Sequence, residues 1–360
     1  MSLFTLHRTM LAAIAVVVAG FLTIGAGCSS DPNVEGAKLD LRNKDFDRAL
    51  VNLDKALENN PNNSEAHFLK GQVYQEMATE EPEVIAHTEL IHNMADAYAM
   101  ALETAPADGS EELRTDIGQR SKLAWYNEYQ RGLAQYNREN YSDAAIFFTN
   151  ATELEPDSSA TYVNLAFAYI SGEQPTDAIA PLEMAIEKGD RNPDTYNYLS
   201  DLYLQENRND DAVATLEEAH DMWPENAEVT ARLFNVYART NQLEKAMAIA
   251  ESEVEREPDN AQHWYNYGSL LLEAERYDDA IMALEKSIEI EPDNISGLFN
   301  LGAAYQNKGV DLNDEVSTLD DEIRGGELSE EDAAAAQEKM EATAAQRDDL
   351  FGKSLEPLTK

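Results

Sequence analysis

The sequence predicts an all-α protein built from repeated helix hairpins, because alanine recurs with a constant period of 34 residues. Prolines close four of the repeating units, and a position filled mostly by tyrosine keeps the same step. A fixed period of roughly 20 to 50 residues is typical of stacked repeat proteins. The residues in phase are Ala144, Ala178, Ala212, Ala246 and Ala280 in one position, and Pro156, Pro224, Pro258 and Pro292 in another.

Each unit contains two amphipathic stretches separated by turn residues, which indicates a helix hairpin. Large residues at positions 4, 7 and 11 share a face of the first helix, and positions 20, 24 and 27 share a face of the second. Small residues at positions 8, 20 and 27 let helices approach closely, while aromatic residues and leucines fill the space between hairpins. One hairpin cannot bury its apolar face alone, so neighbours must stack. Position 1 of the regular units is Trp125, Ser159, Pro193, Ala227 and Ala261.

The unit from Ala261 to Asn294 carries the pattern most fully. Its residues in phase are Trp264, Tyr267, Gly268, Leu271, Tyr277, Ala280, Leu284 and Pro292. This pattern resembles the tetratricopeptide repeat family. The resemblance implies a right-handed α-solenoid, a superhelix of antiparallel helix hairpins, with about eight units in this chain. It also implies that proteins or peptides bind along the concave surface of the superhelix.

Departures from the regular period predict the domain organisation. The second repeat is lengthened around residues 80–83, and a long helix from about Glu111 leads into Trp125. The last unit is interrupted because Asp314 stands where the recurring alanine belongs. The predicted segments are a signal peptide (1–27), a lipidated cysteine with a short tether (28–35), N-terminal repeats (36–108), the lead-in helix with five regular repeats (109–294), and an interrupted C-terminal repeat (295–360).

The interruption in the last repeat predicts a protruding helical hairpin. Two helix extensions are joined by Gly325 and Gly326, and Ser329 is expected to cap the second helix, which starts at Glu330. The repeat pattern resumes only at Ser354 and Leu358, with Pro357 in the same register, and the sequence ends at position 26 of that unit. Because arrays normally end in a polar capping helix, we expect that the natural chain continues or that a partner covers this end.

The N-terminal sequence resembles a secretory signal peptide, with Arg8 followed by an apolar run from Met10 to Ala26. The run that ends at Cys28 resembles a bacterial lipobox, in which the cysteine is lipidated and becomes the first mature residue. Cys28 is also the only cysteine of the chain. We therefore expect an exported lipoprotein, with an ordinary cleaved signal or an uncleaved membrane anchor as the alternatives.

Ser29 after the cysteine resembles an outer-membrane address, on either the periplasmic or the outer face. An inner-membrane anchor with periplasmic repeats is the alternative. The lipid would provide the membrane attachment, because an anionic bilayer repels so acidic a chain.

The chain is strongly acidic, with 69 acidic and 27 basic residues and a formal net charge of −42. This charge argues against a nucleic-acid partner. Two interpretations remain open: a specific site for basic partners, or a uniformly acidic surface of the kind found in salt-loving bacteria. The even spread of carboxylates over the repeats favours the second.

No catalytic, cofactor or metal motif emerges from the sequence. His87 and His92 are five residues apart and point to different faces of a helix, so they form no zinc pair. The acidic run 311–322 has calcium-loop spacing, but Val316 occupies the position that requires glycine. A solvated acidic helix is therefore expected there, and the protein is predicted to be non-enzymatic.

The best candidate for a partner-binding site is the groove formed by positions 2, 5, 9, 12 and 13 of the first helices. In the units that start at Trp125 and Ser159 these positions are unusually apolar. They hold Tyr126, Tyr129, Leu133, Tyr136, Val163, Phe167 and Ile170. One interpretation is a patch that accepts an aromatic or aliphatic peptide. The other is that these side chains pack against the long helix before Trp125 or line a joint to the second repeat.

The following two units are polar in the same groove positions. They hold Asp194, Asn197, Asp201, Glu228, Asn235 and Arg239. Asparagines at position 6 (Asn164, Asn266 and Asn300) partly resemble the ladder of sugar-transferring family members, but asparagine is also common there for structural reasons.

The sequence thus favours a lipid-anchored adaptor that recruits envelope proteins through its curved surface. A surface carbohydrate-binding lipoprotein that uses the groove aromatics is the alternative. The partner, the pathway and the oligomeric state do not follow from the sequence.

Overall fold

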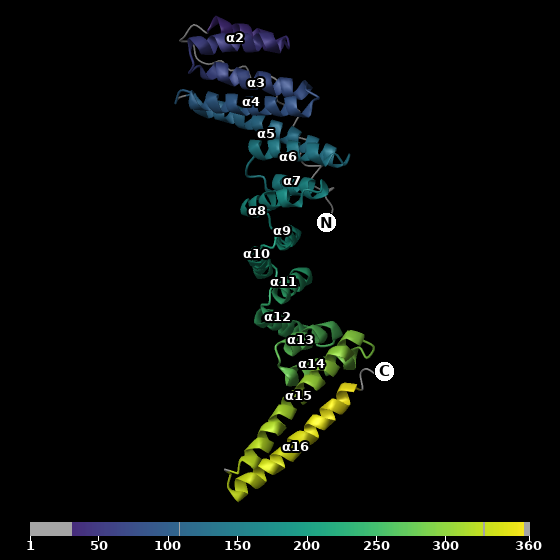
Figure 1. Cartoon of the computed structure of the whole chain (residues 1–360). Helices are drawn as coiled ribbons and strands as arrows, with labels where there is room; N and C mark the ends of the chain where they lie inside the picture. Colours follow the sequence, from purple (N-terminus) through teal and green to yellow (C-terminus); the bar gives the residue numbers. More distant parts are fainter. Residues whose placement is uncertain (1–30, 108, 327, 356–360) are drawn as a thin grey trace. The chain divides into compact units, whose positions relative to one another are not determined.

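The computed structural model describes residues 31–107, 109–326 and 328–355, and these residues form helices and turns with no β-strand. The chain divides into two compact units. Of the described residues, unit 1 comprises 31–107, 109–131 and 153–155, and unit 2 comprises 132–152, 156–326 and 328–355. In each unit, helices that follow one another in sequence pack together as hairpins (Figure 1). The fold is an α-solenoid, as the sequence predicts.

Unit 1 contains two apolar clusters that join consecutive helices. The first links α1, α2 and α3 through Val34, Leu53 and Val73, and the second links α3, α4 and α5 through residues that include Met94 and Ile117. The helices are α1 (Pro32–Arg42), α2 (Phe46–Asn59), α3 (Ser64–Glu80), α4 (Val84–Glu103) and α5 (Ser110–Tyr136), the last of which ends in unit 2.

The lengthened hairpin α3–α4 is held to α5 by a buried polar contact. His87 and Glu128 are almost fully buried, and their side chains lie 2.7 Å apart from Nε2 to Oε1. The other ring nitrogen of His87 lies 2.8 Å from the carbonyl oxygen of Ala78, near the end of α3. Arg131 donates to the carbonyl of Thr79 at 3.3 Å. These side chains satisfy carbonyls at the end of α3 that have no partner within the helix.

Unit 2 contains the regular repeats and the C-terminal hairpin. Its largest apolar cluster runs from α7 to α16 and includes Leu182, Leu216 and Leu284. The helices are α6 (Tyr141–Leu154), α7 (Ser159–Ser171), the 3₁₀ helix η2 (Pro175–Ala178), α8 (Ile179–Glu187), α9 (Pro193–Gln205), α10 (Asn209–Met222), α11 (Ala227–Arg239), α12 (Leu243–Arg256), α13 (Ala261–Glu273), α14 (Tyr277–Ile290), α15 (Ile295–Gly325) and α16 (Glu330–Leu355).

The recurring alanines are buried to 0% exposure at all five steps, which confirms the packing predicted for that position. A second regularity lies in the turn between the two helices of six hairpins of the described chain, α3–α4 and α15–α16 being the exceptions. There, one residue other than glycine has a positive φ near 60°, in the left-handed region that ends many helices. These residues are Lys44, Glu139, Glu173, Asn207, Asn241 and Glu275.

Tyrosine at position 11 links successive repeats of unit 2. Tyr203 donates a hydrogen bond of 2.5 Å to Glu183, and Tyr237 donates one of 2.6 Å to Glu217 on the preceding hairpin. Tyr305 and Glu285 make the same contact. At the joint before α13 this position is Leu271 instead. Burial, followed by the neighbouring carboxylate, raises the pKa of Tyr203 and of Tyr237, so both hydroxyls stay protonated donors.

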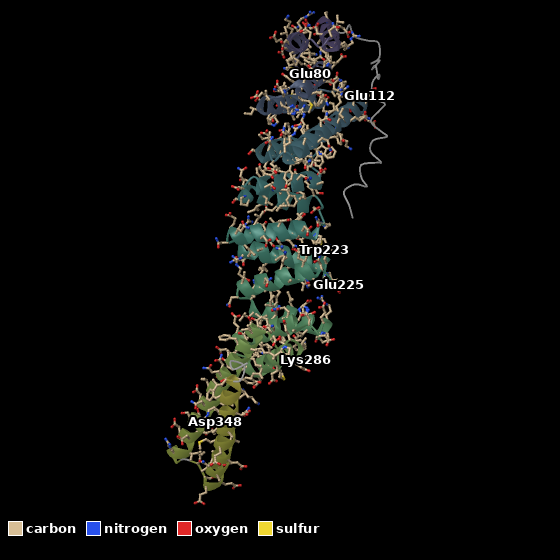
Figure 2. The ribbon with its side chains drawn as sticks, turned by 90° about the vertical axis from the view of Figure 1, so that its right-hand side faces the viewer. Glu80, Glu112, Trp223, Glu225, Lys286 and Asp348 are labelled. Atoms are coloured by element: carbon tan, nitrogen blue, oxygen red, sulfur yellow. The ribbon has the colours of Figure 1, made fainter. Side chains whose placement is uncertain are left out.

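The C-terminal hairpin is formed by the two longest adjacent helices of unit 2. Helices α15 and α16 run antiparallel and lie side by side in both views (Figure 1 and Figure 2), where Asp348 marks α16. Gly326, with φ 69°, ends α15, and the Ser329 hydroxyl accepts from the amide of Asp332, which confirms the predicted cap. A Cβ at Gly309 would lie 2.7 Å from the Phe351 ring, so glycine permits this close packing.

The acidic run 311–322 lies entirely within α15. It is therefore an acidic helix, as expected, and not a calcium-binding loop. Pro357 and Leu358 of the resumed repeat pattern lie outside the described residues, as do the predicted signal peptide and Cys28.

Candidate partner-binding surface

The seven apolar groove residues predicted from the sequence are all half-buried. Two of them belong to unit 1. Tyr129 packs with its ring 5.9 Å from Trp125, and Tyr126 lines a cavity of about 330 Å³ together with His87, Glu128 and Arg131. Because the polar groups at this cavity engage one another and the end of α3, their arrangement has a structural explanation.

The other five residues belong to unit 2. Tyr136 contacts the Ser171 hydroxyl at 2.8 Å and the Tyr141 ring at 5.3 Å, while Ile170 packs against the main apolar cluster. Phe167 makes an edge-to-face contact with Tyr198, with ring centroids 5.1 Å apart and an interplanar angle of 87°. Leu133 and Val163 are half-buried.

The Phe167–Tyr198 contact belongs to a series between consecutive first helices. A residue at position 9 of one repeat meets a residue at position 6 of the next. Asp201 pairs with Arg232 at 2.6 Å, and Ser269 accepts from Asn300 at 2.9 Å. The contact is thus aromatic between α7 and α9, ionic between α9 and α11, and a neutral hydrogen bond between α13 and α15. The scaffold stays constant while the chemistry presented on it changes.

The ionic part of this series contains a shared carboxylate. Arg232 donates to Asp201 and, at 3.2 Å, to Glu228 Oε1. The same Glu228 oxygen accepts a long bond of 3.4 Å from the amide nitrogen of Asn197. Partial burial opposes the charge of Arg232, but the two carboxylates outweigh it and raise the pKa of its guanidinium. Arg232 therefore carries its positive charge at every physiological pH.

The buried amide of Asn197 is incompletely satisfied. Its side chain is 3% exposed, and its carbonyl oxygen has no hydrogen-bond partner among the described residues. Such a group is unusual, because the great majority of buried polar side-chain atoms in folded proteins are paired.

Sequence reasoning missed the residues at position 6 of this surface. Tyr198 is 43% exposed and Arg232 bridges two helices, yet neither occupies one of the five groove positions used for the prediction. The one signal in the sequence was that Tyr198 and Arg232 replace the asparagine that three other repeats have at position 6. Phe299 was also missed, although it occupies groove position 5 of the last repeat and is 64% exposed.

The asparagines at position 6 have partners within the protein. Asn164 donates to the Ala160 carbonyl, Asn266 accepts from Gln262, and Asn300 donates to Ser269. These contacts support the structural interpretation of the partial ladder.

Among residues 31–107, 109–326 and 328–355, no group of three or more histidine, cysteine or acidic side chains is placed to hold a metal ion. His87 is buried against Glu128, whereas His92 is half exposed and pairs with Glu153 at 3.0 Å. The described helices also include none that is long and apolar enough to cross a membrane.

Family models match three parts of the chain. A model described as tetratricopeptide repeat matches residues 203–266, one described as TPR repeat matches residues 268–309, and a further tetratricopeptide repeat model matches residues 52–81. No match is found among the curated proteins.

Several solved structures are similar to parts of the chain. YrrB, described as a TPR protein with an unusual peptide-binding site, is 22% identical with a TM-score of 0.40, over 48% of this chain and 88% of that chain. The P58(IPK) TPR domain is 16% identical with a TM-score of 0.32, over 91% and 97%. PilF of Pseudomonas aeruginosa is 20% identical with a TM-score of 0.34, over 66% and 93%.

Proposed function

The chain is a tetratricopeptide repeat protein, and we propose that it is a non-enzymatic scaffold that binds other proteins at the cell envelope. One observation carries the proposal. Along the first helices of unit 2, the contact between positions 9 and 6 changes from aromatic to ionic to neutral, while the hairpins beneath it keep the same packing. Variation of exposed chemistry on a constant framework is what a recognition surface needs.

The partner-binding part of the proposal uses the open faces of first helices. The residues predicted from the sequence in unit 2 are Leu133, Tyr136, Val163, Phe167 and Ile170, and we add Tyr198 because its ring contacts Phe167. Tyr126 and Tyr129 of unit 1 remain predicted members of a binding groove. Half-exposed aromatic side chains support this function because they provide a large contact area at a small cost in side-chain entropy.

The anchoring part of the proposal rests on the N-terminal sequence. A leader of residues 1–27 before Cys28 supports export and lipidation, and Ser29 supports the outer membrane over the inner membrane as the destination. Acyl chains stabilise membrane attachment by about 0.8 kcal/mol for each buried methylene, so two or more chains hold the protein firmly.

The test uses crosslinking in the native host. Cells that express the tagged full-length protein are crosslinked, and the copurifying proteins are identified by mass spectrometry. Cys28→Ser removes the proposed lipid acceptor, and Ser30→Ala serves as a neighbouring control. In parallel, an alkyne fatty acid fed to the cells reports lipidation directly.

A stable set of envelope proteins that is lost with Cys28→Ser, together with fatty-acid labelling of the control only, supports the anchored scaffold. No protein partner in any variant contradicts it. Retention of the protein on a glycan array, abolished by Tyr129→Ala with the helical content unchanged, points instead to carbohydrate binding.

A further inference from the structure

We propose that the surface formed by α7, α9 and α11 binds a partner segment in which a lysine or arginine lies next to an aliphatic or aromatic residue. This inference rests on the proposed scaffold function and specifies the chemistry of the partner. Two features that adjoin each other on α9 carry it: the ring pair made with α7 and the carboxylates shared with α11.

The apolar half of the surface is the Phe167–Tyr198 pair. Tyr198 is a large side chain that remains 43% exposed, and its edge-to-face contact with Phe167 holds the ring in one orientation. An ordered, exposed ring loses little entropy when an apolar side chain packs on it. Such a ring also attracts a cation placed over its face.

The charged half begins one residue away from Tyr198. Asp194, Asn197 and Asp201 follow the three- and four-residue spacing that places side chains on one face of a helix. Glu228 joins this face from α11 through its contact with Asn197. Asp201 and Glu228 thus flank the guanidinium of Arg232, and Asp194 adds a third carboxylate on the same face of α9, so negative charge is in excess here.

Asn197 shows that the charged half is not fully satisfied. Its amide nitrogen and Arg232 compete for the same Glu228 oxygen, at 3.4 and 3.2 Å, while its carbonyl oxygen has no partner in the described part of the chain. A donor from a partner would relieve this unfavourable burial. Because that oxygen is covered, a side chain must first move. Arg232, which shares Glu228 with Asn197, is held only by carboxylates that are 46% and 61% exposed, so we expect it to be the side chain that moves.

We therefore expect the partner cation to exchange with Arg232 between Asp201 and Glu228. Its apolar neighbour would then rest on Tyr198. This places the two specificity-determining contacts one helical turn apart on α9, at Tyr198 and at Asp201.

The net charge favours a basic partner over other occupants. A second copy of this chain carries the same formal charge of −42, and an anionic membrane surface is also negative, so both are repelled. A basic segment is attracted, and its association should weaken as salt screens the charges.

Fluorescence anisotropy with the full-length protein in nonionic detergent tests this inference. The probe is a labelled twelve-residue glycine–serine peptide with a central Lys-Leu-Lys core. Matched peptides carry Glu-Leu-Glu or Lys-Gly-Lys. We expect the Lys-Leu-Lys peptide to bind at least about tenfold more tightly than either, and the difference from Glu-Leu-Glu to shrink in high salt.

Variants assign the binding to the two halves. Asp201→Asn and Glu228→Gln should each weaken binding of Lys-Leu-Lys about fivefold, because each removes one partly exposed ion pair. Asp210→Asn, an exposed charge-matched control on α10, should leave it unchanged. Tyr198→Ala should lower the affinity for Lys-Leu-Lys to the affinity that the wild-type protein has for Lys-Gly-Lys. Arg232→Gln should raise the affinity for Lys-Leu-Lys, since the internal competitor is gone. Circular dichroism confirms that each variant is folded.

Equal binding of the three peptides overturns the inference, and so does binding that is indifferent to both carboxylate substitutions. Weaker binding by Arg232→Gln contradicts the exchange. Self-association that is lost in Tyr198→Ala, measured by analytical ultracentrifugation, assigns the surface to a second copy. A host partner whose crosslinking is unaffected by Asp201→Asn leaves the scaffold function intact but overturns this inference.

Discussion

The joints between repeats are built differently in the two units. In unit 1 the lengthened hairpin α3–α4 is held to α5 by the fully buried pair His87–Glu128. In unit 2 the regular repeats share contacts between a buried tyrosine and a half-exposed glutamate, such as Tyr237–Glu217. The polar contacts between regular repeats are therefore many, similar and small, whereas the irregular hairpin adds one buried polar pair to its apolar cluster. Four experiments test how far this difference extends.

The largest effect is expected for Glu128→Ala. This substitution leaves His87 buried beside an empty space and should destabilise the α3–α4–α5 region by about 3 to 5 kcal/mol. Hydrogen exchange of the amides in these helices measures the local free energy of opening, which is the appropriate quantity for a two-unit chain. Glu89→Ala, at an exposed site on α4, is the control and should change it by less than about 0.5 kcal/mol. Similar changes in the free energy of opening for Glu128→Ala and Glu89→Ala would show that the buried pair has no special role in this joint.

Glycine substitutions in unit 1 test how closely this hairpin is packed. A Cβ at Gly71 would lie 2.4 Å from the Tyr98 ring, so Gly71→Ala should destabilise unit 1 by about 1 to 3 kcal/mol. At Gly118 nothing lies within 4 Å, and Gly118→Ala should stabilise α5 by about 0.5 to 1 kcal/mol. Urea denaturation followed by circular dichroism gives the order of the two variants, and a reversed order contradicts the close packing.

A smaller effect is expected in unit 2 for Tyr237→Phe, which removes the hydroxyl that donates to Glu217. The loss should be about 1 kcal/mol, the usual net contribution of one hydrogen bond. Tyr169→Phe is the matched control. Tyr169 occupies the same repeat position as Tyr237, but the preceding repeat has Thr149, and not a glutamate, at the position that corresponds to Glu217. Hydrogen exchange in α10 and α11 compares the two. A loss above 3 kcal/mol for Tyr237→Phe would show that this single contact contributes as much to stability as the His87–Glu128 pair does in unit 1.

The smallest effect concerns pH. Lys245 and then Tyr237 lower the pKa of Glu217 below its ordinary value of 4.5. The stabilisation by this carboxylate is therefore present above pH 4.5 and is lost as pH falls through the lower pKa of the folded state. Because Glu217 is 40% exposed, the contribution should stay below about 1 kcal/mol. Urea unfolding at pH 7, 5 and 3 should show a slightly flatter pH dependence for Glu217→Gln, and an unchanged profile would argue against this contribution.

Much of the fold could be predicted because the repeat positions are set by local packing. The recurring alanines, the Ser329 cap and the Gly326 turn follow from period and residue type alone. The His87–Glu128 contact could not be predicted in the same way. It joins residues 41 apart across an irregular insertion, where the period no longer specifies which side chains face each other.

The candidate site was predicted less completely, for a related reason. Phe167 was identified from its groove position, but Tyr198 and Arg232 occupy position 6, which faces the preceding repeat. Their importance depends on the pairing between neighbouring hairpins, and a pattern derived from single repeats does not contain it. The unpaired oxygen of Asn197 likewise depends on the side chains of two helices at once.

Photocrosslinking from position 198 in living cells tests the central claim most directly. A benzophenone amino acid replaces Tyr198 in the full-length protein, and a matched variant carries it in place of the exposed Asp210 on α10. We expect an envelope protein to be crosslinked from position 198 but not from position 210, through a segment that combines a basic with an apolar residue. Absence of any adduct at position 198, or equal adducts at both positions, would contradict it.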